Sequence, residues 1–266
     1  MAGQGSNAGT PSASITQQKQ KSVFREYAEA LLVALLLALF IRSFIVQAFK
    51  IPSGSMLSTL QIGDHILVSK FAYGLRLPYP FDTVLFEWAN PERDDVIVFI
   101  YPKDETKDFI KRVVAVEGDR VHIRDKQLFV NGEAAENTYA RYAGSGRVIP
   151  GLRDNYPQPL PDGSVEPITV PPGKLFVMGD NRDHSHDSRF WGFVPETHIV
   201  GKPVFIWLSI DSAEKGLKKI RWERMFTTVS GSGQPVSYLL YTVVGVLVII
   251  VVVKVMKNKK RHEKKK

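Results

Sequence analysis

The amino-acid sequence predicts a mostly β chain: an antiparallel β domain with an inserted lobe, plus two transmembrane helices. Three observations support this prediction. Short apolar runs in the middle of the chain are bounded by Gly, Pro, Asp or Asn. No long helical periodicity occurs between these runs. Two much longer apolar segments lie near the ends of the chain, at residues 27–49 and 238–253.

Composition allows a sizeable core and excludes thiol chemistry. The chain has 266 residues, of which 44% are hydrophobic, and this is enough for one large domain or two small ones. It has no cysteine. Disulfides, thiolate nucleophiles and thiolate metal ligands are therefore excluded, and any nucleophile must be an oxygen or an amine.

The positive charge is concentrated at the C-terminal end. The formal net charge is +8, and residues 254–266 hold eight Lys or Arg against one Glu, which gives +7. Residues 50–253 hold 23 Lys or Arg against 24 Asp or Glu, which gives −1. Since the body has no basic bias, we expect no nucleic-acid partner.

The first apolar segment is predicted to be a transmembrane helix within residues 24–49, after a disordered cytoplasmic leader at residues 1–23. Residues 27–49 would reach ~34 Å as a helix, enough for a hydrocarbon core ~30 Å thick. Arg42 weakens this interpretation, because an arginine inside the membrane is costly. The alternative is a cleaved signal peptide, with residues 30–41 as its apolar region and a cleavage site near residues 46–48.

The second apolar segment predicts a transmembrane helix at residues 237–256, followed by a basic cytoplasmic tail at residues 257–266. Lys19, Lys21 and Arg25 precede the first segment. By the positive-inside rule both termini are expected in the cytoplasm. The chain would then be multi-pass, with its body on the outer face and in contact with membrane lipid.

The strands of the body are predicted from alternating or continuous apolar runs, at residues 65–71, 95–101, 109–116, 174–178 and 199–208. Residues 120–130 alternate around Asp125-Lys126, and Asn131-Gly132 follows, which is a strong hairpin signal. We therefore expect a β domain made of residues 50–119 and 173–212. Residues 120–172 form the inserted lobe, and residues 213–236 form a linker.

A hydroxyl-rich turn, Ile51-Pro52-Ser53-Gly54-Ser55-Met56, follows the first apolar segment. A serine nucleophile needs a base and an oxyanion hole. None of the six histidines lies in a local triad signature, and the G-x-S-x-G motif is absent. Considered alone, the turn is more typical of structure than of catalysis.

A lysine can replace histidine as the base if burial keeps its amine uncharged near neutral pH. Lys111 and Arg112 are adjacent in the predicted strand at residues 109–116, so they point to opposite faces. If one face is buried, a cation lies in apolar surroundings, which is typical of a functional group. The alternative is an edge strand on which both charges reach solvent.

A polar segment follows the predicted strand at residues 174–178. Its sequence, residues 179–189, is GDNRDHSHDSR, which contains acids and histidines that could hold a metal. Arg182 and Arg189 lie among the acids and favour internal ion pairs. We expect no metal there.

Three motifs together resemble the bacterial type I signal peptidases, membrane-bound serine proteases that remove signal peptides from exported preproteins. They are IPSGSM at residues 51–56, FIKRVVAVEGD at residues 109–119 and MGDNRDHSHDSR at residues 178–189, in the family's order. The resemblance covers about residues 24–210. It implies a β domain of the signal peptidase type, which Ser/Lys self-cleaving repressors share.

The resemblance implies a Ser/Lys dyad, with Ser55 as nucleophile and Lys111 as general base. Ser53 would add its hydroxyl to the Ser55 backbone N–H as the oxyanion hole. Cleavage would follow small residues of the preprotein. No cofactor and no metal are implied.

The resemblance also implies four supporting residues in the third motif. Ser185 would hydrogen-bond the Lys111 amine, Asp187 and Arg189 would hold their loop by an ion pair, and Gly179 would allow close packing beside the site.

The resemblance places the chain in the bacterial inner (plasma) membrane, with the catalytic domain on the extracytoplasmic (periplasmic) face and secretory preproteins as partners. Ser58, Glu117 and His184 depart from residues that are frequent in the family, which puts local loop geometry in question. The absence of a helix-turn-helix opposes a repressor. A non-catalytic extracytoplasmic binding module with two membrane anchors is the remaining alternative.

Overall fold

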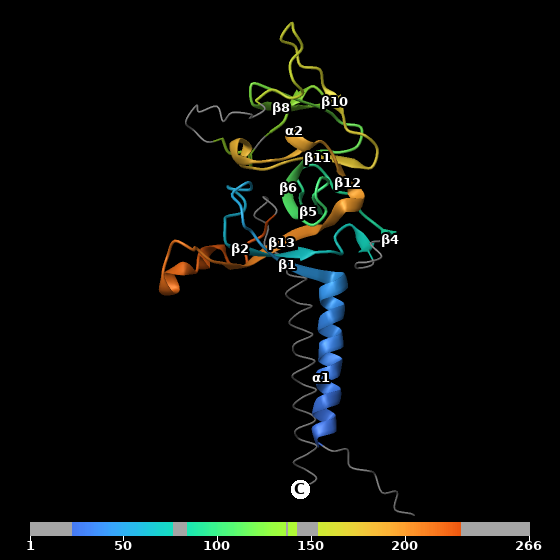
Figure 1. Ribbon diagram of the computed structural model, residues 1–266, viewed down its shortest axis with the longest axis vertical. Coiled ribbons are helices and arrows are strands. Elements are labelled where there is room, and N and C mark those ends of the chain that lie inside the picture. Colours follow the sequence, from blue (N-terminus) through green and yellow to red (C-terminus); the bar gives the residue numbers. More distant parts are fainter. Residues whose placement is uncertain (1–22, 77–83, 137, 143–153, 230–266) are drawn as a thin grey trace, which may run out of the picture. The chain divides into compact units, whose positions relative to one another are not determined.

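The computed structural model describes residues 23–76, 84–136, 138–142 and 154–229 (Figure 1). The chain divides into two compact units, one ending at Phe40 and one beginning at Ile41, which are described separately. Most of the predicted leader, the second transmembrane helix and the basic tail lie outside the described residues.

The first unit contains helix α1 (Val23–Phe40), rich in Ala and Leu, which favour helix. The segment Tyr27–Ile45 is strongly apolar along its 19 residues. Of the helices in the described part of the chain, this one is long and apolar enough to cross a membrane.

The helix is shorter than the sequence predicts. A short π-helix, η1 (Ile41–Ile45), begins the second unit, and strand β1 (Val46–Lys50) follows it. The prediction that residues 46–49 are helical is therefore wrong. Their backbone groups pair instead with strand β2, from Val46 opposite Ser69 to Lys50 opposite His65. Tertiary pairing overrides the local apolar pattern here.

A seven-stranded antiparallel sheet forms the main body and confirms the mostly β, antiparallel part of the predicted fold class. Its strand order is β1-β2-β13-β5-β6-β11-β12 (Figure 1). The remaining strands of this sheet are β2 (Asp64–Ser69), β5 (Val96–Ile100), β6 (Asp108–Ala115), β11 (Lys174–Met178), β12 (Val194–Pro195) and β13 (Ile199–Ser209). The five strands predicted for the body are all present in it.

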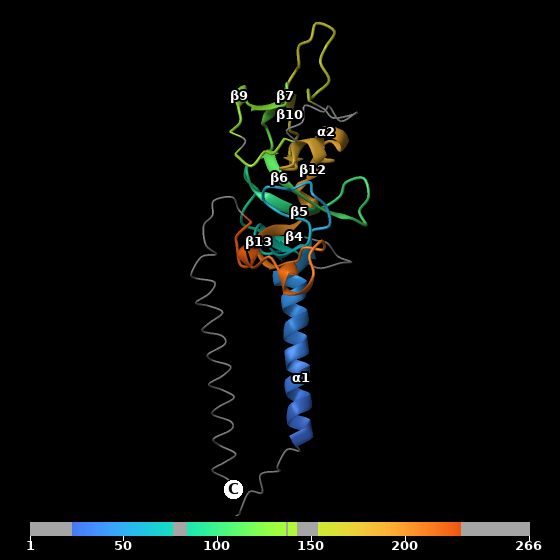
Figure 2. The same ribbon diagram turned by 90° about the vertical axis from the view of Figure 1, so that its left-hand side faces the viewer.

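A four-stranded sheet, ordered β10-β7-β8-β9, is built from the predicted lobe (Figure 2). Its strands are β7 (Arg120–Arg124), β8 (Gln127–Val130), β9 (Glu133–Ala134) and β10 (Ile168–Thr169). Positive φ angles at Asp125, Lys126, Asn131 and Gly132 form its two tight turns. Such turns match the twist of the strands that they join, so the hairpin prediction is confirmed.

The short elements were not predicted from sequence, because they span too few residues for a periodic signal. Strands β3 (Gly74–Arg76) and β4 (Val84–Glu87) pair as a hairpin. The short helices are η2 (Arg182–His184), α2 (Ser188–Trp191), η3 (Glu196–His198), η4 (Gly216–Lys219) and η5 (Trp222–Arg224).

Strands β5 and β6 lie inside the seven-stranded sheet, with core on both faces. Val96 and Val98 pack in one apolar cluster with Met56, whereas Ile97 and Phe99 pack in another. Strand β6 pairs with β5 on one side and with β11 on the other. Strand β6 is therefore not an edge strand, so its two cationic side chains, Lys111 and Arg112, face the two buried sides of the sheet.

The core can be tested with two phenylalanines of opposite exposure. Phe176 is fully buried, whereas Phe86 is 66% exposed. We expect Phe176→Ala to lower the free energy of unfolding by about 3 to 5 kcal/mol, because it leaves a cavity. Phe86→Ala should change it by no more than about 0.5 kcal/mol. Urea unfolding of the detergent-solubilised chain measures both. Equal effects would contradict the packing described.

Candidate active site

The turn after β1 is fixed at both ends. The Leu57 N–H donates to the Gly54 carbonyl at 3.2 Å, and the Leu60 N–H donates to the Met56 carbonyl at 2.8 Å. Met56 and Leu60 are fully buried and hold this turn to the core. The Ser55 side chain is thereby given a defined place, and the residue is 8% exposed.

Lys111, from the interior strand β6, contacts the Ser55 hydroxyl. Its Nζ lies 2.7 Å from Ser55 Oγ and 2.9 Å from the Ile110 carbonyl oxygen. The two residues are separated by 56 positions in the sequence. The structure therefore brings the predicted nucleophile and base into hydrogen-bond contact, within the range that general-base catalysis requires.

The surroundings of Lys111 favour its neutral form. The residue is 4% exposed, and its Nζ lies 5.5 Å from the centre of the Phe109 ring. Burial lowers the pKa of Lys111 to about 8, against the opposing charges of Asp187 and Asp180. A substantial fraction of the amine is thus uncharged at mildly alkaline pH.

Arg112 points to the other face of β6 and is also buried, at 2% exposure. Its guanidinium forms a two-pronged ion pair with Asp180, with both nitrogen–oxygen distances 2.8 Å. It also donates to the Asp94 carbonyl and to the Thr59 hydroxyl. The alternative in which Lys111 and Arg112 both reach solvent is therefore wrong.

Gly179 fits the expected close packing. A Cβ atom there would lie 2.3 Å from Ser185 Oγ and 2.5 Å from the Ser55 carbonyl oxygen, too close for any side chain. Asp187 and Arg189 form the expected ion pair, at 2.8 Å with both groups buried. Burial alone would raise the pKa of Asp187, but Arg189 and hydrogen bonds hold it below its usual range.

Ser185 lies beside the site but makes different contacts from those expected. Its hydroxyl accepts from the Gly179 N–H at 3.1 Å. The expected hydrogen bond to the Lys111 amine is not made. The amine instead contacts the Ser55 hydroxyl and the Ile110 carbonyl oxygen.

The acids of the third motif are engaged by cations. Asp180 pairs with Arg112 and Asp187 with Arg189, and Asp183 lies 3.3 Å from Lys126. In the part of the chain that the structure describes, no group of three side chains is placed to hold a metal ion. This pairing matches the preference for internal ion pairs inferred from the sequence.

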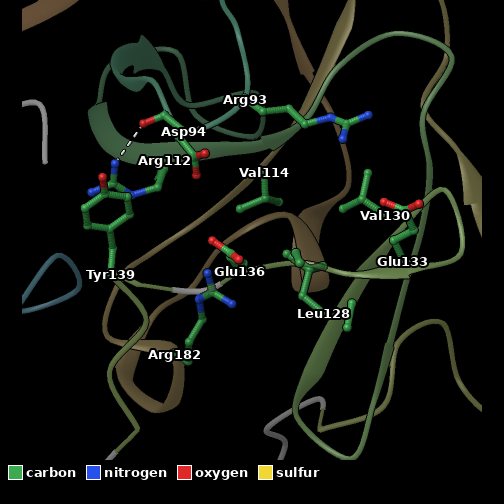
Figure 3. A pocket seen from close by; sticks show the side chains of 12 residues that line it. Arg93, Asp94, Arg112, Val114, Leu128, Val130, Glu133, Glu136, Tyr139 and Arg182 are labelled. Atoms are coloured by element: carbon green, nitrogen blue, oxygen red, sulfur yellow. Dashed lines mark hydrogen bonds between the residues drawn. The ribbon is translucent and has the colours of Figure 1, made fainter. Parts of the chain in front are cut away.

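A cavity of about 370 Å³ lies on the Arg112 face of β6 (Figure 3). Figure 3 shows Arg112 and Tyr139 together at one side, 3.8 Å from guanidinium carbon to ring centre, and Arg182 beside Glu136. Neither Ser55 nor Lys111 lines it. This cavity is therefore separate from the contact between Ser55 and Lys111.

Asn181 was missed by the sequence reasoning. Its backbone N–H donates to the Ser55 carbonyl at 3.0 Å, and its side-chain amide donates to the Gly54 carbonyl at 2.9 Å. The only sequence signal was its place in the third motif, because contacts across 127 positions leave no local pattern.

The comparisons with known proteins agree with these observations. A family model described as "Signal peptidase, peptidase S26" matches residues 24–208. A protein named Signal peptidase I from Pseudomonas fluorescens is 38% identical over 234 residues, which cover 77% of this chain and 80% of that protein. A protein of the same name from Pseudomonas aeruginosa is 41% identical over 206 residues, covering 69% and 72%.

The lowered pKa of Lys111 can be measured directly. In the detergent-solubilised chain with ¹³Cε-labelled lysine, we expect the Lys111 resonance to titrate near pH 8. Lys107 is the internal control, because its hydrogen bond to Asp104 raises its pKa above the usual value. Lys111→Arg assigns the resonance by its loss. If Lys111 titrates together with Lys107, burial does not depress its pKa.

Proposed function

The chain belongs to the S26 family of signal peptidases, and we propose that Ser55 and Lys111 form its catalytic dyad. It is a serine endopeptidase that removes signal peptides from preproteins. The observation that carries the residue assignment is the 2.7 Å contact between the Ser55 hydroxyl and the buried Lys111 amine. A buried lysine with a lowered pKa is typical of a general base.

The first half of the reaction is acyl transfer to Ser55. The neutral Lys111 amine accepts the Ser55 proton while Ser55 Oγ attacks the carbonyl carbon of the scissile bond. When the tetrahedral intermediate collapses, the lysine ammonium gives that proton to the leaving amine. The C–N bond breaks, the mature protein leaves with a free amino group, and the signal peptide stays as an ester on Ser55.

The second half is hydrolysis of this ester. Lys111, neutral again, accepts a proton from a water molecule that attacks the ester carbonyl. Collapse of the second intermediate returns a proton to Ser55 Oγ and releases the signal peptide with a new carboxylate. One lysine thus serves both steps, and no cofactor or metal takes part.

The oxyanion hole is assigned to the Ser55 N–H and the Ser53 hydroxyl. Among the described residues, none accepts a hydrogen bond from the Ser55 N–H. Ser53 is exposed and stands two positions earlier in the same turn. Donors without protein partners at this point suit an oxygen that becomes charged in the transition state.

The remaining residues of the third motif support the dyad. Gly179 lets this motif approach Ser55, and Asp187 and Arg189 hold the loop that follows. Ser185 fixes the Gly179 backbone through its hydroxyl. From that position it is assigned to orient the Lys111 amine during the reaction.

Substrate preference follows from the apolar cluster around the turn. Ile51, Met56 and Leu60 are buried in it, and Ile110, the neighbour of Lys111, and Phe49 are partly buried against it. The exposed parts of Ile110 and Phe49 offer a limited apolar surface, which suits small side chains of an extended peptide. We assign to this surface the small residues at the first and third positions before the cut.

The enzyme is membrane-anchored, and its N-terminal apolar helix fits that role. We place it in the bacterial inner membrane as a multi-pass protein, with the catalytic domain on the extracytoplasmic face and both termini in the cytoplasm. The Lys and Arg residues outside the two apolar segments support this orientation. The β domain would comprise residues 50–119 and 173–212, with residues 120–172 as its inserted lobe.

Substitution of either member tests the dyad. In detergent, cleavage of a preprotein should fall at least about 10³-fold in Ser55→Ala and in Lys111→Ala, because each change removes a group needed in both chemical steps. Lys107→Ala is the matched control, since Lys107 is exposed, and it should keep wild-type activity. Full activity in either dyad variant would refute the assignment.

The orientation is tested in inverted inner-membrane vesicles. Added protease should digest the C-terminal lysine tail and spare the β domain, because the tail faces the cytoplasm in the proposed topology. Digestion after detergent permeabilisation shows that the domain is cleavable when accessible. A tail that survives in intact inverted vesicles would reverse the orientation of the C-terminus.

A further inference from the structure

Asn181 holds the two peptide groups on either side of Ser55. Its side-chain amide nitrogen lies 2.9 Å from the Gly54 carbonyl oxygen. Its backbone nitrogen lies 3.0 Å from the Ser55 carbonyl oxygen. Because a carbonyl oxygen can only accept, the side-chain NH₂ group must face Gly54. One residue therefore restrains both peptide planes adjoining the candidate nucleophile.

The Gly54 carbonyl belongs to the same planar unit as the Ser55 N–H. In a trans peptide the C=O and N–H point in opposite directions, so fixing one fixes the other. The Gly54 oxygen accepts from Asn181 and also from the Leu57 N–H at 3.2 Å. Donors on the carbonyl also polarise the peptide, which makes its N–H a stronger donor.

Asn181 is itself well fixed. It is 7% exposed, and its segment pairs in parallel with Arg141. The Arg141 N–H donates to the Asp180 carbonyl at 2.7 Å, and the Arg182 N–H donates to the Arg141 carbonyl at 2.9 Å. Asp180 is further held by its buried ion pair with Arg112. The amide of Asn181 is therefore anchored to the sheet and not to a free loop.

We infer that Asn181 is a positioning residue for the oxyanion hole: through the Gly54 carbonyl it aims and polarises the Ser55 N–H at the developing oxyanion. This inference rests on the proposed function of Ser55. It requires the hydrogen bond to the Gly54 carbonyl in particular. Another side chain, Ser58, also ties the turn to its surroundings, by donating to the Tyr139 carbonyl at 2.8 Å. That bond does not touch the peptide between Gly54 and Ser55.

Asn181→Asp is the primary test, because it keeps the size of the side chain, removes the donor and preserves the backbone bond to Ser55. In preprotein cleavage by the detergent-solubilised full chain, we expect kcat to fall about 10- to 100-fold, less than the loss of an oxyanion donor outright. KM should stay within about twofold, since ground-state binding does not use the oxyanion hole. In Asn181→Ala, which adds no charge near Lys111, the alkaline rise of kcat/KM should keep its midpoint near the pKa of Lys111, about 8.

Three further variants make the outcome decisive. Asn181→Ala should lose kcat to a similar extent, and it gives the second measurement if the aspartate variant fails to fold, as judged by thermal melting. Ser58→Ala removes one anchor of the same turn and should keep kcat within about twofold. Wild-type kcat in the folded Asn181 variants, an equal loss in Ser58→Ala, a loss confined to KM, or a shifted pH midpoint in Asn181→Ala would each overturn the inference. Ser55→Ala distinguishes a failure of this inference from a failure of the proposed function. If Ser55→Ala stays active, the proposed dyad itself is wrong.

Discussion

The site depends on keeping the Lys111 amine buried away from water and without a carboxylate as a hydrogen-bond partner. Lys111 sits on an interior strand, 4% exposed, with its Nζ engaged by a hydroxyl and a backbone carbonyl. Neither group carries a charge that would hold the ammonium form in place. Burial therefore dominates and lowers the pKa to about 8. An exposed lysine on an edge strand would stay protonated and could not accept a serine proton.

Two buried arginines, Arg112 and Arg189, help to keep the pKa of Lys111 low. Asp180 and Asp187 are the two carboxylates whose charges oppose the lowered pKa of Lys111. Each forms a buried ion pair with an arginine, Asp180 with Arg112 and Asp187 with Arg189. Buried pairs of this kind are weak evidence for stability, because desolvation offsets much of their attraction. Their effect here is electrostatic: an arginine beside each carboxylate partly cancels the negative potential at the lysine.

The sequence predicted the elements whose signals are local. The strand predicted at residues 174–178 is present, and the tight turn predicted at Asn131-Gly132 is also present. Both features depend on a few consecutive residues. Residues 46–49 were mistaken for helix, since their apolar character does not distinguish a membrane segment from a strand that pairs with β2. The contact between Ser55 and Lys111 came from the family resemblance alone. Asn181 escaped notice, because the sequence cannot show which distant carbonyl an amide will reach.

The turn that carries the proposed nucleophile must be rigid where the backbone positions Ser55 and open where the substrate arrives. Rigid partners hold its two ends: Asn181 holds Gly54 and Ser55, while Arg224 donates to the Thr59 carbonyl and pairs with Asp64. Ser53 is exposed, and no hydrogen bond joins its side chain to another residue in the described part of the chain. A scissile carbonyl can therefore approach from the side of Ser53 without displacing the groups that fix the Ser55 backbone. Because those groups are in place before substrate binds, little reorganisation is needed when negative charge develops, which is the condition under which oxyanion donors are most effective.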